Sequence, residues 1–82
     1  MKQILYFSAP WCGPCKSFGP TMDRVASSGI PLSKINIDYD ATAPAKYSIK
    51  SVPTVVLIEN GQEVKRFVGV KSFQEVINFY NG

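Results

Sequence analysis

The sequence contains no histidine and only two cysteines, Cys12 and Cys15, among its 82 residues. The absence of histidine excludes Ser-His-Asp and Cys-His catalysis, together with every zinc site that needs an imidazole ligand. A zinc site made only of thiolates would require two chains to share one ion. The chemistry of this protein is therefore expected to come from the cysteine pair.

Long hydrophobic runs are also missing from the chain. The longest early run, residues 4–7, is too short for a secretory signal or for a membrane span. A hydrophobic content of 45% with 18% charged residues is typical of a soluble globular protein. We expect residues 1–82 to form one domain, with a cytoplasmic location and no membrane partner.

Clustered charge of one sign is absent as well. Nine basic and six acidic residues give a formal net charge of +3, but the basic residues are scattered along the chain. This distribution predicts no nucleic-acid partner.

Hydrophobic periodicity and turn residues predict the element order β-α-β-α-β-β-α. Pro20 is expected to kink the first helix, and Asn60-Gly61 is a strong hairpin signal. The expected elements are strand 2–8, a helix over about 12–28, strand 32–38, a short helix 41–47, strands 54–58 and 64–68, and a helix over 73–80 with Ser72 as its N-cap.

The first strand, its crossover helix and the second strand should form a right-handed parallel pair, which the hairpin then extends. The predicted fold is α/β, with a central four-stranded mixed sheet and helices on both faces. In such a sheet the reactive site is expected beyond the carboxyl end of a strand, where the next helix begins. Cys12 lies at this position.

The segment Cys12-Gly13-Pro14-Cys15 places two sulfur atoms on nearly the same helix face, where they can close a small disulfide ring. Free N–H groups in the first turn stabilise a thiolate, so Cys12 is expected to be the nucleophile. Cys15 is expected to be more buried and to resolve the mixed disulfide. Gly13 allows another backbone to approach, and Pro14 is well tolerated early in a helix.

Two other interpretations of the cysteine pair are open. A structural disulfide over so short a loop would constrain little chain entropy and would be reduced in the cytosol. A zinc ion shared between two chains is the other alternative.

The run Trp11-Cys12-Gly13-Pro14-Cys15-Lys16 resembles the active-site signature of the thioredoxin family. The resemblance covers nearly the whole chain in register, so it is far more specific than an isolated C-x-x-C. It continues through Pro20, Lys34-Ile35-Asn36-Ile37-Asp38, Ala43-Pro44, Lys46-Tyr47, Val52-Pro53-Thr54, Asn60-Gly61 and Gly69.

The resemblance implies a minimal thioredoxin fold in which Val52-Pro53 is a cis peptide facing the cysteines. The Val52 backbone would then bind an extended substrate. The implied apolar docking surface consists of Trp11, Pro53, Gly69 and Val70.

The implied activity is the reduction of protein disulfides by a monomer that binds no cofactor. A separate thioredoxin reductase would recharge the disulfide with electrons from NADPH.

The sequence departs from the family pattern in two respects. Thioredoxins of ordinary length carry a further strand and helix before the first strand expected here. Tyr6 aligns with the buried acid that the family uses beneath the second cysteine, and Lys34 matches the lysine that partners this acid. We expect Cys15 to lose its proton to water with help from Tyr6 or Lys34, although Lys34 also fits a solvated strand residue.

Two alternative functions follow from the same sequence. A glutaredoxin-like protein would be recharged by glutathione, whose backbone Val52-Pro53 and Gly69 could help to hold. A thioredoxin-fold binding subunit would need no turnover, and its binding would survive replacement of both cysteines by serine.

Overall fold

The computed structural model describes residues 1–82, and its element order confirms the prediction. Only the ends of the elements differ: the second strand, predicted over 32–38, ends at Asn36, because the side chain and carbonyl of Asn36 accept hydrogen bonds from the following turn. The elements are β1 (Lys2–Ser8), α1 (Gly13–Ser27), β2 (Leu32–Asn36), α2 (Thr42–Lys46), β3 (Thr54–Glu59), β4 (Gln62–Val68) and α3 (Phe73–Asn81).

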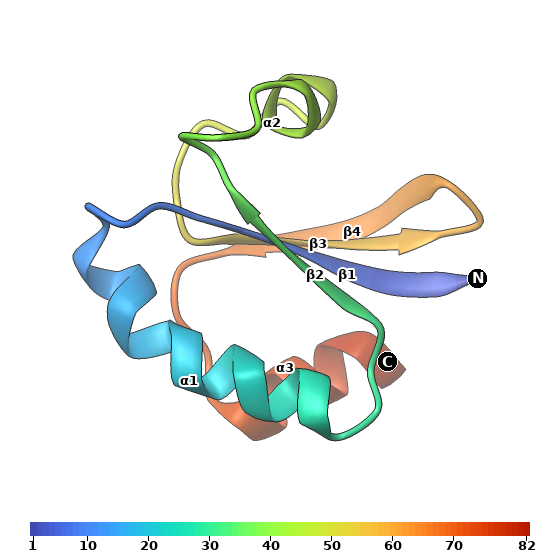
Figure 1. Ribbon diagram of the computed structural model, residues 1–82. Coiled ribbons are helices and arrows are strands. Elements are labelled where there is room, and N and C mark those ends of the chain that lie inside the picture. The colour runs from blue at the N-terminus through green and yellow to red at the C-terminus, as the bar shows by residue number, and fades with distance from the viewer.

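The four strands form one mixed sheet in the order β2-β1-β3-β4. β1 pairs in parallel with β2, whereas the pairs β1–β3 and β3–β4 are antiparallel. Helices α1 and α3 cover one face of the sheet, and α2 lies over the other (Figure 1). The predicted fold class is therefore confirmed. None of the three helices has the length and apolar character needed to cross a bilayer.

Two of the three buried clusters hold the layers together, and the third consists of Ala9, Cys12 and Cys15. The larger one joins β1 and β3 to α1 and α3, and the smaller one lies under α2. The larger cluster contains Ile4, Tyr6, Phe18, Met22, Val25, Val55, Leu57 and Val76, and the smaller contains Phe7, Val56 and Ile58.

Local sequence signals explain several element ends. Asn60 and Gly61 have φ values of 53° and 84°, the positive values that a tight hairpin turn requires. The Ser72 hydroxyl accepts from the Glu75 amide at 3.2 Å, and the Glu75 carboxylate accepts from the Ser72 amide at 2.9 Å, which forms a capping box at the start of α3. α1 continues through Pro20 as a single helix.

Candidate active site

Cys12 lies between the carboxyl end of β1 and the first turn of α1. It is the N-cap of α1, where its sulfur accepts from the Cys15 amide at 3.2 Å. Its own amide donates to the Ala9 carbonyl at 3.2 Å, and Pro14 occupies the first turn, where no amide donor is needed. The β1–α1 junction therefore presents one cysteine to the unpaired donors of the helix N-terminus.

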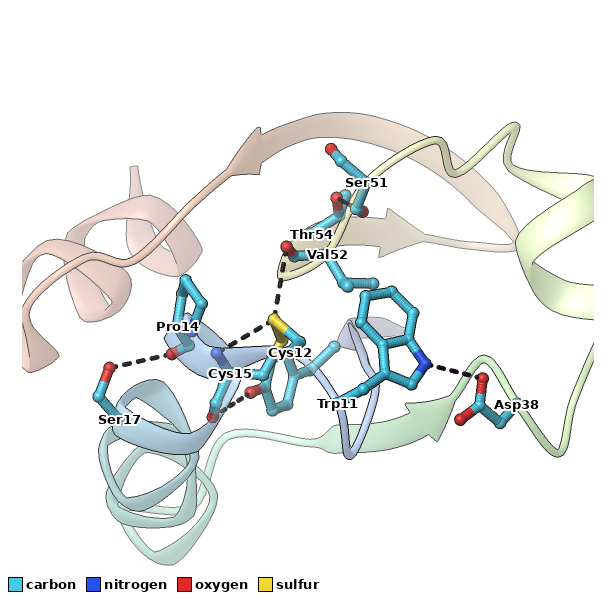
Figure 2. The surroundings of a disulfide bond; sticks show 10 residues. Trp11, Cys12, Pro14, Cys15, Ser17, Asp38, Ser51, Val52 and Thr54 are labelled. Atoms are coloured by element: carbon cyan, nitrogen blue, oxygen red, sulfur yellow. Dashed lines mark hydrogen bonds between the residues drawn. A yellow bond between two sulfur atoms is a disulfide. The ribbon is translucent and has the colours of Figure 1, made fainter.

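Cys12 and Cys15 form a disulfide, with their Cα atoms 5.3 Å apart (Figure 2). The expectation that Cys15 would be the more buried of the two was wrong, because each residue is 5% exposed. The reason is a second loop that covers Cys12: its sulfur lies 3.6 Å from the carbonyl oxygen of Val52.

The covering loop precedes β3 and contains the cis peptide Val52-Pro53, as the family resemblance implied. The hydroxyl of Thr54, the first residue of β3, donates to the Ser51 carbonyl at 2.6 Å and thereby attaches the loop to the strand. The Gly69 amide donates to the Pro53 carbonyl at 2.9 Å, which brings the end of β4 to the same place. Gly69 has a φ of 97°, which favours glycine.

The residues expected to dock a substrate surround this loop with unequal exposure. Trp11 is 66% exposed and Val70 is 51% exposed. Val52 and Gly69 are half-buried, whereas Pro53 is buried. The exposed apolar surface at the disulfide is therefore supplied chiefly by the indole and by one valine.

Asp38 is a further residue that contacts the site. The Trp11 indole N–H donates to its carboxylate at 3.2 Å (Figure 2). The two residues lie in different loops, so no local spacing signals the contact, which depends on how β1 and β2 end side by side.

Tyr6 lies directly beneath the cysteine turn. Its side chain is 1% exposed, its ring packs edge-on against Phe18 with centroids 5.6 Å apart, and its hydroxyl donates to the Cys15 carbonyl at 3.4 Å. Burial raises the pKa of Tyr6 above its ordinary value, the hydrogen bond with Ser8 works in the opposite direction, and the negative charge of Asp23 adds to the rise. The phenol therefore stays protonated at neutral pH.

Lys34, the other candidate for proton transfer, occupies a different environment. Its ammonium pairs with Asp23 of α1 at 2.9 Å, and its side chain is 52% exposed. The structure thus brings Tyr6 to the cysteines and places the Lys34 ammonium in a surface ion pair. No group of three or more potential metal-ligating side chains is present.

The chemistry that this arrangement can support is thiol-disulfide exchange. Two sulfur atoms at a helix N-terminus can store two electrons as a dithiol and release them by forming the observed disulfide. The exposed indole and the Val52 carbonyl offer an incoming chain an apolar contact and a hydrogen-bond acceptor next to the sulfur.

Comparisons with known proteins agree with this chemistry. The family model described as Thioredoxin matches residues 1–81. The chain is 40% identical over 81 residues to thioredoxin of Haemophilus influenzae, covering 95% of this chain and 76% of the relative. It is 46% identical over 70 residues to thioredoxin of Mycoplasma pneumoniae, covering 83% and 69%.

Solved structures are similar in fold as well as in sequence. A mutant thioredoxin from Halobacterium salinarum matches with a TM-score of 0.90 at 27% identity, over 98% of this chain and 72% of that one. Fasciola hepatica thioredoxin matches with a TM-score of 0.87 at 34% identity, over 96% and 80%.

Proposed function

Because this chain belongs to the thioredoxin family and is a thiol-disulfide oxidoreductase, we propose that Cys12 and Cys15 divide the reduction of a protein disulfide between them. The observation that carries the proposal is the Cys12–Cys15 disulfide at the N-terminus of α1, beside the Val52 carbonyl. The nucleophile is Cys12, since its sulfur occupies the N-cap position.

The reaction has two exchange steps. The Cys12 thiolate attacks one sulfur of the substrate disulfide, forms a mixed disulfide and releases the other substrate sulfur as a thiolate, which takes a proton from water. The Cys15 thiolate then attacks the Cys12 sulfur, so that the Cys12–Cys15 disulfide forms and the second substrate sulfur leaves as a thiolate, which also takes a proton from water. Two electrons pass from the dithiol to the substrate.

Tyr6 is the residue that we propose to assist the second step. Its hydroxyl lies at hydrogen-bond distance from the Cys15 carbonyl and holds the backbone of the resolving cysteine. Because its pKa is raised by burial, it supplies a neutral donor and not a buried negative charge near the sulfur atoms. The Cys15 proton then passes to water.

We also propose that the cysteine pair is oxidised and reduced in a cycle in the cytoplasm. A separate thioredoxin reductase returns two electrons from NADPH to the Cys12–Cys15 disulfide, and the monomer then reduces another protein. A reducing compartment suits this direction of exchange, because thiols are kept reduced there.

The test supplies the oxidised protein with NADPH and thioredoxin reductase, and separately with glutathione, glutathione reductase and NADPH. The measured quantities are NADPH consumption and the free thiols of Cys12 and Cys15. Turnover that depends on thioredoxin reductase is the expected result. Turnover with glutathione alone would instead assign the chain to a glutathione-dependent pathway.

Cysteine variants separate the two sulfur roles. Cys15→Ser should accumulate a mixed disulfide with a disulfide-containing substrate, because Cys12 can attack but nothing resolves the product. Cys12→Ser should trap far less substrate. The assignment of the nucleophile fails if the two variants trap equal amounts, as measured by mass spectrometry of the non-reduced protein.

A further inference from the structure

The carboxyl end of α2 is joined to the sheet by Arg66 of β4. The Arg66 guanidinium donates to the Tyr47 carbonyl at 2.7 Å and pairs with the Glu63 carboxylate at 2.6 Å. Arg66 lies opposite Val56 in the β3–β4 pair, and Val56 belongs to the buried cluster under α2. Opposite residues of an antiparallel pair share a face of the sheet, so the Arg66 side chain lies on the α2 face. There it satisfies a carbonyl at the end of a helix.

The end of α2 has few other means of staying in place. α2 contributes no buried residue, and the half-buried ring of Tyr47 packs at a tilt against Phe7, with centroids 6.3 Å apart. The next residue, Ser48, has a φ of 53°, in the left-handed region that a residue with a side chain enters at a cost. Such a conformation persists where surrounding contacts hold it. The bond from Arg66 is a contact of this kind, directly before the turn.

This turn leads into the loop that covers Cys12. The chain runs from Ser48 to Val52, whose carbonyl oxygen lies 3.6 Å from the Cys12 sulfur. The far end of the loop is attached to β3 through the Thr54 hydroxyl. Its near end is attached to β4 through Arg66. The position of the Val52 carbonyl relative to the sulfur therefore depends on both attachments.

We propose that Arg66 is a positioning residue for disulfide reduction, because it holds the end of α2 and thereby keeps the Val52 carbonyl beside Cys12. In the proposed reaction this carbonyl accepts a hydrogen bond from the incoming chain, so a displaced loop binds that chain less tightly. Arg66 acts through the loop and not on the sulfur atoms. The proposal rests on the proposed function, because it concerns how a protein disulfide is held while it is reduced.

The experiment compares two disulfides that differ in their need for the loop. A disulfide-bonded peptide has a backbone that can pair with Val52, whereas the disulfide of mercaptoethanol has none. The second-order rate constant for reduction of each by the reduced protein is measured. Arg66→Gln should lower the rate constant for the peptide about threefold, as expected for the loss of one exposed interaction. The rate constant for the disulfide of mercaptoethanol should not fall, since this reagent needs only access to the Cys12 sulfur.

Two control variants assign the effect to the bond between Arg66 and Tyr47. Glu63→Gln removes the ion pair but leaves the guanidinium as a donor to the Tyr47 carbonyl, so it should reduce the peptide at the wild-type rate. Arg24→Gln removes the same charge as Arg66→Gln from α1, where the guanidinium lies over the Phe73 ring, and should also keep the wild-type rate.

Every other outcome contradicts a defined claim. An unchanged peptide rate in Arg66→Gln overturns the proposal, and so does an equal loss with both disulfides, which would indicate damage to the cysteine chemistry itself. The same peptide loss in Glu63→Gln assigns the effect to the ion pair, and the same loss in Arg24→Gln assigns it to net charge. Either result overturns the role of the Tyr47 bond and leaves disulfide reduction intact. Failure of the wild type to reduce the peptide overturns the proposed function itself.

Discussion

The two faces of the sheet differ in how they are covered. On one face, helices of 15 and 9 residues, α1 and α3, enclose a cluster of eight buried residues. On the other face, the 5-residue helix α2 contributes no buried residue and lies over a cluster of three (Figure 1). The first face has the depth of a packed core, whereas the second depends on half-buried side chains.

Polar contacts support the thinner face. The Arg66 guanidinium of β4 pairs with Glu63 at 2.6 Å and donates to the Tyr47 carbonyl, at the end of α2, at 2.7 Å. The chain then leaves α2 and enters the loop that contains Val52 and covers Cys12. Elements with few buried apolar contacts open at low free energy, so we expect the α2 face, with the loop that covers Cys12, to be the less stable side of the molecule.

The largest expected difference between the faces comes from removing a core ring. Phe18, a residue of α1, is 0% exposed. Phe18→Ala leaves a cavity between α1 and the sheet, and it should lower the free energy of unfolding by about 3–5 kcal/mol. Tyr47→Ala, on the face of α2, removes a half-buried ring and should cost clearly less. Urea unfolding followed by circular dichroism measures both. Equal costs would contradict the contrast between the two faces.

Tyr6→Phe is expected to have a smaller effect, because it keeps the ring against Phe18 and removes only the hydroxyl. The lost hydrogen bond to the Cys15 carbonyl should cost about 1 kcal/mol. The variant should also slow release of the second substrate thiol, as measured by rapid mixing with a disulfide substrate. An unchanged rate at every pH would remove Tyr6 from the resolving step.

The raised pKa of Tyr6 makes the free energy of unfolding depend on pH in the alkaline range. The unfolded chain ionises this phenol at its ordinary pKa, whereas the folded protein still holds the proton. The stabilisation is therefore complete below the ordinary tyrosine pKa and is lost as pH rises from there through the folded-state pKa. Tyr6→Phe should not show this component of the loss, so its unfolding free energy should approach that of the wild type at high pH.

The sequence predicted the face covered by α1 and α3 well, because the residue patterns that specify these elements are local in the sequence. Phe18, Met22 and Val25 recur at helical spacing within the predicted helix over 12–28, and all three are 0% exposed. The hairpin at Asn60-Gly61 follows from two residues that tolerate positive φ. The Ser72 N-cap is local in the same sense.

The features of the site that sequence reasoning missed depend on loops that meet in space. The equal burial of Cys12 and Cys15 results from the Val52 loop, which is distant in sequence. The bond from Trp11 to Asp38 joins the loops that follow β1 and β2. The spacing of the cysteines predicts how their two sulfur atoms lie relative to each other, but it contains no information about a loop that folds over them. The position of Val52 was therefore indicated only by the family resemblance.

Arg66→Gln is expected to have the smallest effect on overall stability, but it tests the difference between the two faces most directly. Arg66→Gln breaks the pair with Glu63 and the bond to Tyr47, and for an exposed interaction it should cost about 0.5 kcal/mol. Its local effect should be larger, because this guanidinium joins β4 to the end of α2. Hydrogen exchange of the Tyr47 amide, which donates to the Ala43 carbonyl, should accelerate. Arg24→Gln, a matched control on the α1 face, should leave this exchange rate unchanged.

Acidification gives an independent check on the same contact. The hydrogen bond from the Arg66 guanidinium holds the pKa of Glu63 below its ordinary value, the attraction of the two charges acts in the same direction, and partial desolvation opposes both. The stabilisation is therefore present above the ordinary glutamate pKa and is lost as pH falls through the folded-state pKa. The difference in unfolding free energy between wild type and Arg66→Gln should narrow over this acidic range. The idea is contradicted if this free-energy difference stays constant over the acidic range and Arg66→Gln leaves hydrogen exchange of the Tyr47 amide unchanged. The ion pair would then not support the α2 face, and α2 would be held by its apolar contacts alone.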